Sequence, residues 1–286
     1  MKTLDINKIV SEVKNYGCYK IEGFLNKEEI LKAREIASNN KKGYSAKSGI
    51  LSHNFGLKKK DQYVPHTFKS LLIKFIKLDF KKLNQGLFAI KIFQRRPQLK
   101  EICNRIFEKK NKLSFIDGYM INNNEKIIWH TDKMMSKNLN DNKLIFFVYL
   151  DDVDEKSGSM GYIKGSHKII YHLKKGLISK KLSITSSRDD NKLPLDGANF
   201  SIPFLKSLVE DKINYNYLIQ SLNNKFKVDY FLEKLQIIID NKKETNEFFF
   251  KMNKGDAIVF DQSGIHGGSE VANNQRSVLR FAFNKI

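Results

Sequence analysis

Five short apolar segments in the second half of the chain constrain its fold more than any other feature. Each is rich in aromatic and aliphatic residues and is bounded by Gly, Asn or Asp, which is typical of β-strands between tight turns. The segments cover residues 113–122, 144–153, 160–166, 256–262 and 277–285. We therefore predict a mainly β module over residues 113–286.

The residues before this module predict a helical preface over 1–112. A short strand and turn at 17–25 precede a helix that begins at Asn26, because Glu29 three residues later completes a capping box. Residues 40–66 are polar and predict a loop. Apolar residues at helical spacing predict a helix over 67–85. Pro97, near a first helical turn, predicts another over 97–109.

A Lys- and Asn-rich stretch at 170–250 interrupts the β module. Helical patterns near 204–222 and 226–240 indicate that it is folded, and no Pro- or Gly-rich linker separates it from the rest. We predict one domain over 1–286, with barrel strands in 113–169 and 251–286. Residues 170–250 are expected to form a lid-like insertion carried by one barrel loop.

Composition limits the partners and the location of the chain. Its formal net charge is +20, which favours an anionic partner such as nucleic acid. Only seven of the 51 basic residues are Arg, however, and Arg is the usual residue for specific base contacts. No specific nucleic-acid partner is therefore expected. Two cysteines 85 positions apart, Cys18 and Cys103, form neither a disulfide framework nor a zinc motif.

The sequence contains no run of ~18 apolar residues, so no membrane span is predicted. The first residues also lack the apolar core of a signal peptide. We therefore expect a cytoplasmic protein.

Residues 129–132 read Trp-His-Thr-Asp. Alternate residues of an extended segment point to the same side, so His130 and Asp132 converge. An imidazole and a carboxylate together suit a divalent transition metal. By itself the pair also fits an ordinary hydrogen-bonded surface pair.

A second histidine, His266, follows a predicted strand among small residues, and Arg276 comes ten residues later. Two histidines and one carboxylate on one face of Fe(II) leave positions open for a chelating cosubstrate and O₂. The planar guanidinium of Arg276 suits the far carboxylate of such a cosubstrate. A surface salt bridge is the alternative for Arg276, and Arg280 competes for its role.

Four stretches of the sequence resemble the phytanoyl-CoA dioxygenase family of Fe(II)/2-oxoglutarate oxygenases. The stretches are GCYKIEGFLNKEEI (17–30), WHTD (129–132), LDDVDEKSGSMGYIKGSHK (150–168) and GDAIVFDQSGIHGGSEVANNQR (255–276). The resemblance implies a double-stranded β-helix, which is a jelly-roll, cupin-like barrel with flanking helices. It also implies Fe(II), 2-oxoglutarate and O₂ as cofactor and cosubstrates.

Carried over residue by residue, the resemblance makes His130, Asp132 and His266 the metal ligands and Arg276 the partner of 2-oxoglutarate. Thr131, between two of these ligands, and Phe147, on a predicted strand, are further candidates for the cosubstrate pocket. Two positions depart from the pattern. Lys164 replaces the usual proline, and Gly268 stands where relatives often carry a hydroxyl, a role that Ser269 would have to take.

These residues predict hydroxylation of an unactivated C–H bond in a small-molecule substrate, with release of succinate and CO₂. Because Asp132 retains the carboxylate that related halogenases lack, hydroxylation is favoured over halogenation. Two alternatives remain open: a catalytically silent barrel that binds a ligand, and a nucleic-acid-directed oxygenase or binder. The sequence leaves the choice between a monomer and a dimer open. Ser166 and His167 are expected to hold a tight turn through local hydrogen bonds.

Overall fold

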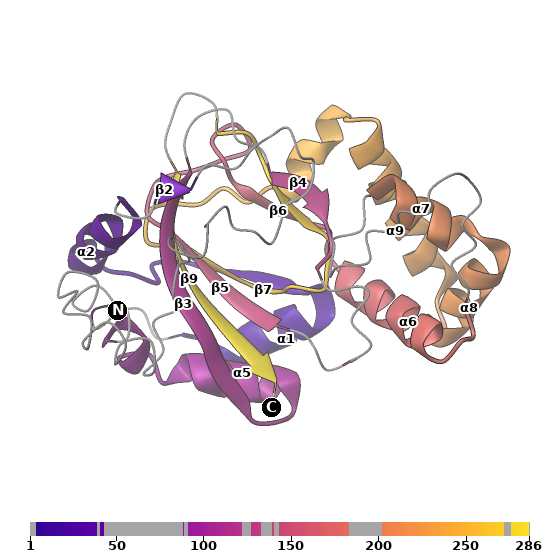
Figure 1. Cartoon of the computed structure of the whole chain (residues 1–286), viewed down its shortest axis with the longest axis horizontal. Helices are drawn as coiled ribbons and strands as arrows, with labels where there is room; N and C mark the ends of the chain where they lie inside the picture. Colours follow the sequence, from indigo (N-terminus) through magenta and orange to yellow (C-terminus); the bar gives the residue numbers. More distant parts are fainter. Residues whose placement is uncertain are drawn as a thin grey trace.

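The computed structural model describes residues 4–38, 41–42, 88, 91–121, 127–132, 139, 143–182, 202–271 and 276–285. The helix predicted over 67–85 and most of the loop predicted over 40–66 lie outside these residues. Two sheets and two groups of helices make up the described part (Figure 1).

The larger sheet has six strands in the order β1-β7-β5-β9-β3-β2. Its strands pair antiparallel, except for the parallel pair of β2 and β3. The strands are β1 (Cys18–Ile21), β7 (Ala257–Asp261), β5 (Lys143–Tyr149), β9 (Arg276–Lys285), β3 (Asn111–Ile121) and β2 (Lys41–Lys42). Each of the five predicted β segments overlaps one strand of this sheet or of its smaller partner, so the prediction of a mainly β fold is confirmed.

The smaller sheet has three antiparallel strands in the order β4-β8-β6. They are β4 (Ile127–His130), β8 (His266–Gly268) and β6 (Met160–Tyr162). Apolar residues of both sheets, among them Phe147, Ile258, Met160 and Tyr162, share one buried cluster. This cluster is the interior of the jelly roll.

Strand β5 shows why its sequence is apolar without alternation. Leu144, Phe146 and Val148 point to one face of the large sheet and belong to the core under the N-terminal helices. Phe147 and Tyr149 point to the other face and belong to the barrel interior. A strand that is buried on both faces has no position for a polar residue.

Three N-terminal helices cover the outer face of the large sheet (Figure 1). They are α1 (Ile6–Tyr16), α2 (Lys27–Ser38) and α5 (Gln98–Phe107). The predicted capping box is confirmed at the start of α2. The Asn26 side chain accepts from the Glu29 backbone N–H at 2.9 Å, and the Glu29 carboxylate accepts from the Asn26 N–H at 3.1 Å. The helix predicted after Pro97 is α5.

The insertion forms a separate helical layer beside the small sheet (Figure 1). It consists of α6 (Ser166–Ile178), α7 (Ile202–Glu210), α8 (Lys212–Leu222), α9 (Lys225–Ile239) and a 3-10 turn at Lys243–Phe248. The helix predicted near 226–240 is confirmed as α9. The helical structure predicted near 204–222 is also confirmed, but it consists of two helices, α7 and α8, which Asp211 separates. The Asp211 carboxylate accepts from the N–H groups of Ile213 and Asn214 and thereby starts α8.

The segment around Ser166 also differs from the prediction. Helix α6 begins at Ser166 and so spans the expected start of the insertion at 170. The Ser166 hydroxyl accepts from the Ile265 N–H at 2.8 Å, and His167 Nε2 lies 3.3 Å from the Lys14 carbonyl. The prediction that these two side chains hold a local turn is therefore wrong, because both contact distant segments. Within the described residues, no helix combines the length and the apolar character that crossing a membrane requires.

Candidate active site

His130, Asp132 and His266 lie together at the edge where β4 meets β8. His130 and His266 are direct partners in the strand register, and their ring centroids are 4.4 Å apart. The Nε2 atoms of His130 and His266 lie 3.7 and 3.9 Å from the Asp132 carboxylate oxygens. All three residues are buried, and their candidate ligand atoms lie within 4.8 Å of one another. The spacing is that of a group able to hold one metal ion.

Backbone carbonyls orient both imidazoles. His130 Nδ1 lies 2.7 Å from the Ile128 carbonyl oxygen, and His266 Nδ1 lies 2.9 Å from that of Gly264. A carbonyl oxygen only accepts, so each Nδ1 donates its proton to the carbonyl, and the neutral form of each imidazole then presents its lone pair at Nε2. Metal-binding histidines commonly have this arrangement, in which the second nitrogen donates to a backbone carbonyl. The Nε2 atoms of both rings face Asp132.

A neighbouring amide holds the Asp132 carboxylate. Gln262 Nε2 donates a hydrogen bond to Asp132 Oδ2, while the buried Gln262 Oε1 has no hydrogen-bond partner in the described part of the chain. Gln262 lies in the turn between β7 and β8, and sequence reasoning missed it. The only signal in the sequence is its position four residues before His266.

Thr131 is fully buried, and its hydroxyl donates to the Ser263 carbonyl at 2.5 Å. This bond ties the end of β4 to the turn that leads to His266. The Thr131 hydroxyl thus contacts another segment of the same chain. The cosubstrate role expected for this residue stays a prediction.

Arg276 is the first residue of β9 and is only 1% exposed. One guanidinium nitrogen, Nη1, donates to the Gly158 carbonyl, whereas the buried Nε has no hydrogen-bond partner among the described residues. No ion pair joins Arg276 to a carboxylate in the part of the chain that the structure describes. Its guanidinium carbon lies 5.8 Å from the centre of the Phe147 ring. A buried cation of this kind is costly unless an anion compensates it.

The loop beside Arg276 is shaped around its side chain. Gly158 has φ +87°, and a Cβ there would lie 3.1 Å from Arg276 Cδ and 2.7 Å from Val271 Cγ2. The Ser269 hydroxyl accepts from the Gly158 N–H at 3.0 Å and lies 3.3 Å from the Asp154 carbonyl. Ser269 thus holds the loop that carries Gly158.

Arg280 differs from Arg276 in both position and burial. It lies in the middle of β9, opposite Phe147 in the register, and is partly exposed. Arg276 is therefore the buried guanidinium of the strand.

Comparison with known proteins agrees with this arrangement. Residues 14–278 match the sequence model of the family described as "Phytanoyl-CoA dioxygenase (PhyH)". The chain belongs to this family. A search of curated proteins found no match to its sequence.

Solved structures share the phytanoyl-CoA dioxygenase fold at low sequence identity. HygX from Streptomyces hygroscopicus with iron bound has a TM-score of 0.52 at 11% identity, covering 99% of this chain and 87% of HygX. EvdO2 from Micromonospora carbonacea var. aurantiaca complexed with 2-oxoglutarate has a TM-score of 0.51 at 10% identity, covering 100% and 92%. AviO1 from Streptomyces viridochromogenes Tue57 has a TM-score of 0.50 at 12% identity, covering 100% and 97%. These likenesses show the fold, and the expected jelly roll is confirmed.

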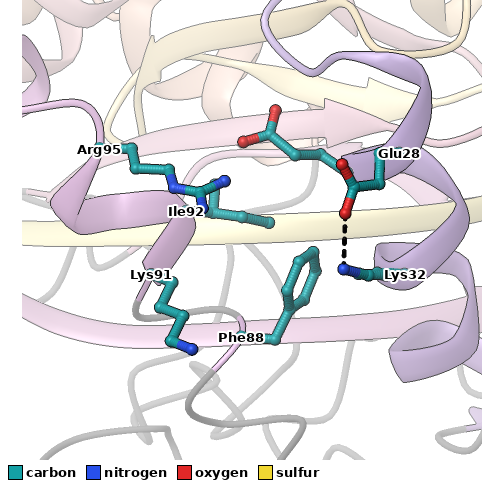
Figure 2. A pocket seen from close by; sticks show the side chains of 7 residues that line it. Glu28, Lys32, Phe88, Lys91, Ile92 and Arg95 are labelled. Carbon is teal, nitrogen blue, oxygen red and sulfur yellow. Dashed lines mark hydrogen bonds and ion pairs between the residues drawn. The ribbon is translucent and has the colours of Figure 1, made fainter.

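The structure has two cavities among its described residues, and only one of these two is lined by a residue of the His-Asp-His cluster. One has a volume of about 250 Å³ and is lined by Asp132 together with residues of α1, α6 and the β7–β8 turn. The other, of about 220 Å³, lies between α2 and residues 88–95 (Figure 2). Its Glu28 and Lys32 pair with each other at 2.7 Å, and none of the three clustered residues lines it. The first cavity is therefore the one connected with the candidate site.

Proposed function

We propose that the chain is an Fe(II)- and 2-oxoglutarate-dependent oxygenase that hydroxylates an unactivated C–H bond of a small molecule. One observation carries the proposal: a buried His130–Asp132–His266 cluster occurs in the same barrel as Arg276, a buried cation without a carboxylate partner among the described residues. The first suits a metal, and the second suits a dicarboxylate cosubstrate. The iron and 2-oxoglutarate in structures of the same fold support the assignment.

The donor set fits Fe(II). Two neutral imidazole nitrogens and one carboxylate oxygen form the facial triad typical of non-haem iron oxygenases. His130 and His266 present Nε2 toward Asp132, so the three donors face one another. When bound, Fe(II) supplies the activation of O₂, coupled to conversion of 2-oxoglutarate into succinate and CO₂.

The chain's own residues position the participants. Gln262 holds one oxygen of Asp132 and so limits rotation of the carboxylate. Arg276 offers guanidinium donors to the far carboxylate of 2-oxoglutarate, in surroundings from which solvent is excluded. Phe147, buried beside this guanidinium, forms an apolar wall of the cosubstrate pocket. Retention of the Asp132 carboxylate favours hydroxylation over halogenation.

The helical layer α6–α9 acts in this proposal as a lid over the barrel mouth. Its core includes Trp129 and Ile265, which immediately precede His130 and His266. Helix α6 also contributes residues to the cavity that Asp132 lines. A cover at this position would keep water from reactive intermediates.

A metal titration combined with cosubstrate turnover tests the proposal. We expect the wild type to bind one Fe(II) per chain, and His130→Ala, Asp132→Asn and His266→Ala each to lose most of the affinity. His172→Ala is the matched control, because this histidine lies on α6 outside the cluster and should leave the metal stoichiometry at one. Formation of succinate from 2-oxoglutarate, screened against a metabolite library, is the second readout. Full iron occupancy in any two of the cluster variants would refute the metal assignment. Iron binding without succinate formation would instead indicate a silent barrel.

A further inference from the structure

Three lysines line the cavity beside Asp132. Lys14 of α1 and Lys168 and Lys174 of α6 line it, together with Tyr171 and the turn residue Ser263. Its volume of about 250 Å³ is at the small end for ligand pockets. A cavity that reaches a candidate metal ligand is where part of a substrate would lie.

The three lysines differ in how their charges are compensated. Lys14 pairs with Glu108 at 2.6 Å. Lys174 is only 8% exposed and has an interaction partner. For Lys168, by contrast, the described part of the chain supplies no ion pair or side-chain hydrogen bond. Among the described residues, Lys168 is thus the cavity lysine without a carboxylate partner.

The surroundings of Lys168 make its uncompensated positive charge costly. Partial burial lowers the pKa of the Lys168 ammonium, and the positive charge of Lys227 on α9 lowers it further. Both effects disfavour the charged form, and the negative charge of an anion in the cavity would oppose them.

The acidic residues of the cavity do not supply that anion. The Asp261 carboxylate accepts from the backbone N–H and the hydroxyl of Ser263, at 2.8 and 2.6 Å. Asp132 accepts from Gln262 and belongs to the proposed metal site. Both carboxylates are committed to the turn and the cluster.

We propose that this cavity binds the acidic group of the substrate, a carboxylate or a phosphate, with Lys168 as its counter-ion. The inference rests on the proposed function, because it assigns a substrate class to the same site. The remaining lining includes apolar side chains, namely Val13, Ile106 and Ile170, which suit the body of such a molecule. Because Lys168 and Asp132 line one cavity, a substrate anchored by its acid group has the rest of its structure close to the candidate metal.

Ligand binding followed by fluorine NMR tests the inference on the full chain. Three ring-fluorinated probes share one apolar body: a phenyl phosphate, a phenylacetate and a neutral phenylethanol. Each is titrated with nickel(II) and 2-oxoglutarate present, and again without both. We expect the acids to bind saturably and the alcohol to bind more weakly, and the relative affinity of the two acids distinguishes a phosphorylated from a carboxylated substrate.

Matched variants assign any binding to Lys168. Lys168→Met keeps the aliphatic stem and should weaken acid binding by about twofold to fivefold, as expected for one partly exposed charge pair. Lys168→Arg should retain most of the affinity. Lys27→Met makes the same charge change at the exposed start of α2, and it should have no effect.

Three results would overturn the inference. The first is equal binding of the neutral and acidic probes. The second is acid binding that Lys168→Met leaves unchanged. The third is a loss of 2-oxoglutarate affinity in Lys168→Met, because the cavity would then hold the cosubstrate. Failure of the wild type to bind nickel or 2-oxoglutarate would count against the proposed function. The probe titration without nickel and 2-oxoglutarate would still test whether the cavity binds acids.

Discussion

Replacement of Arg276 by Met should abolish the response of the protein to 2-oxoglutarate while leaving its fold intact. The guanidinium is 1% exposed and has no carboxylate partner in the described chain, so the substitution breaks no internal ion pair. Truncating one partner of a buried, hydrogen-bonded charge pair costs about 2–5 kcal/mol. At about 1.4 kcal/mol per tenfold, this raises the dissociation constant of 2-oxoglutarate roughly 30- to 3,000-fold.

Thermal or urea unfolding with and without 2-oxoglutarate, in the presence of nickel(II), measures this effect. At a concentration 100 times its dissociation constant, a ligand raises the free energy of unfolding by about 2.7 kcal/mol. A variant whose dissociation constant is raised 100-fold gains only about 0.4 kcal/mol from the same solution. The readout is the increment due to the ligand, so a change in baseline stability does not obscure it.

Arg280→Met is the matched control, because Arg280 is on the same strand but partly exposed. It should keep most of the ligand increment, and Arg276→Lys should fall between the two because it keeps the charge without the planar fork. An undiminished increment in Arg276→Met would refute the reasoning, as would a larger loss in Arg280→Met.

Three further predictions concern residues around the site and the core. Gln262→Met removes the amide that donates to Asp132 and should weaken metal binding by about 10- to 100-fold without unfolding the chain. An unchanged metal affinity in a competition titration with a chelator would contradict this. Burial by itself would raise the pKa of Glu29, but the hydrogen bonds from Arg96 and the Asn26 N–H, together with the Arg96 charge, lower it. The stability that this ion pair contributes is therefore present at neutral pH and is lost as the pH falls through the lowered pKa of Glu29. Glu29→Gln should therefore cost about 3–5 kcal/mol at neutral pH in urea unfolding, with a gap to the wild type that narrows in acid; a gap independent of pH would argue against it. Finally, hydrogen exchange in 170–250 should slow when nickel, 2-oxoglutarate and an acidic probe are added together, and unchanged exchange there, with protection confined to the strands of His130 and His266, would show that the insertion is not a lid.

Features with a local cause could be predicted from the sequence. The run from Leu144 to Tyr149 is apolar because both of its faces are buried, and this pattern is visible without the structure. The capping box at Asn26 and Glu29 depends on residues three positions apart. The order of His130, Asp132 and His266 carried the family resemblance, and the structure brings these three side chains together.

Features with a distant cause could not be predicted. Strand β8 reads His-Gly-Gly and has no strand propensity of its own; it forms because β4 and β6 pair with it on both sides. Gly161 opposite it is required by packing, because a Cβ there would lie 2.4 Å from Trp129 and 2.9 Å from Phe249. Gln262 likewise contacts Asp132 across 130 positions of sequence.

The same alternation that places the metal ligands also connects them to the helical layer. Successive residues of a strand point to opposite faces. Trp129 and Ile265 therefore enter the core of the helices, whereas the next residues, His130 and His266, turn toward Asp132. The Trp129 ring packs against Phe248 and Phe249, with ring centroids 5.8 and 5.4 Å apart. Any shift of this helical core moves the backbone that carries the imidazoles. Because metal binding demands one arrangement of the ligands, the bound metal should stabilise the helical layer, and a cavity made in that layer should in turn weaken metal binding.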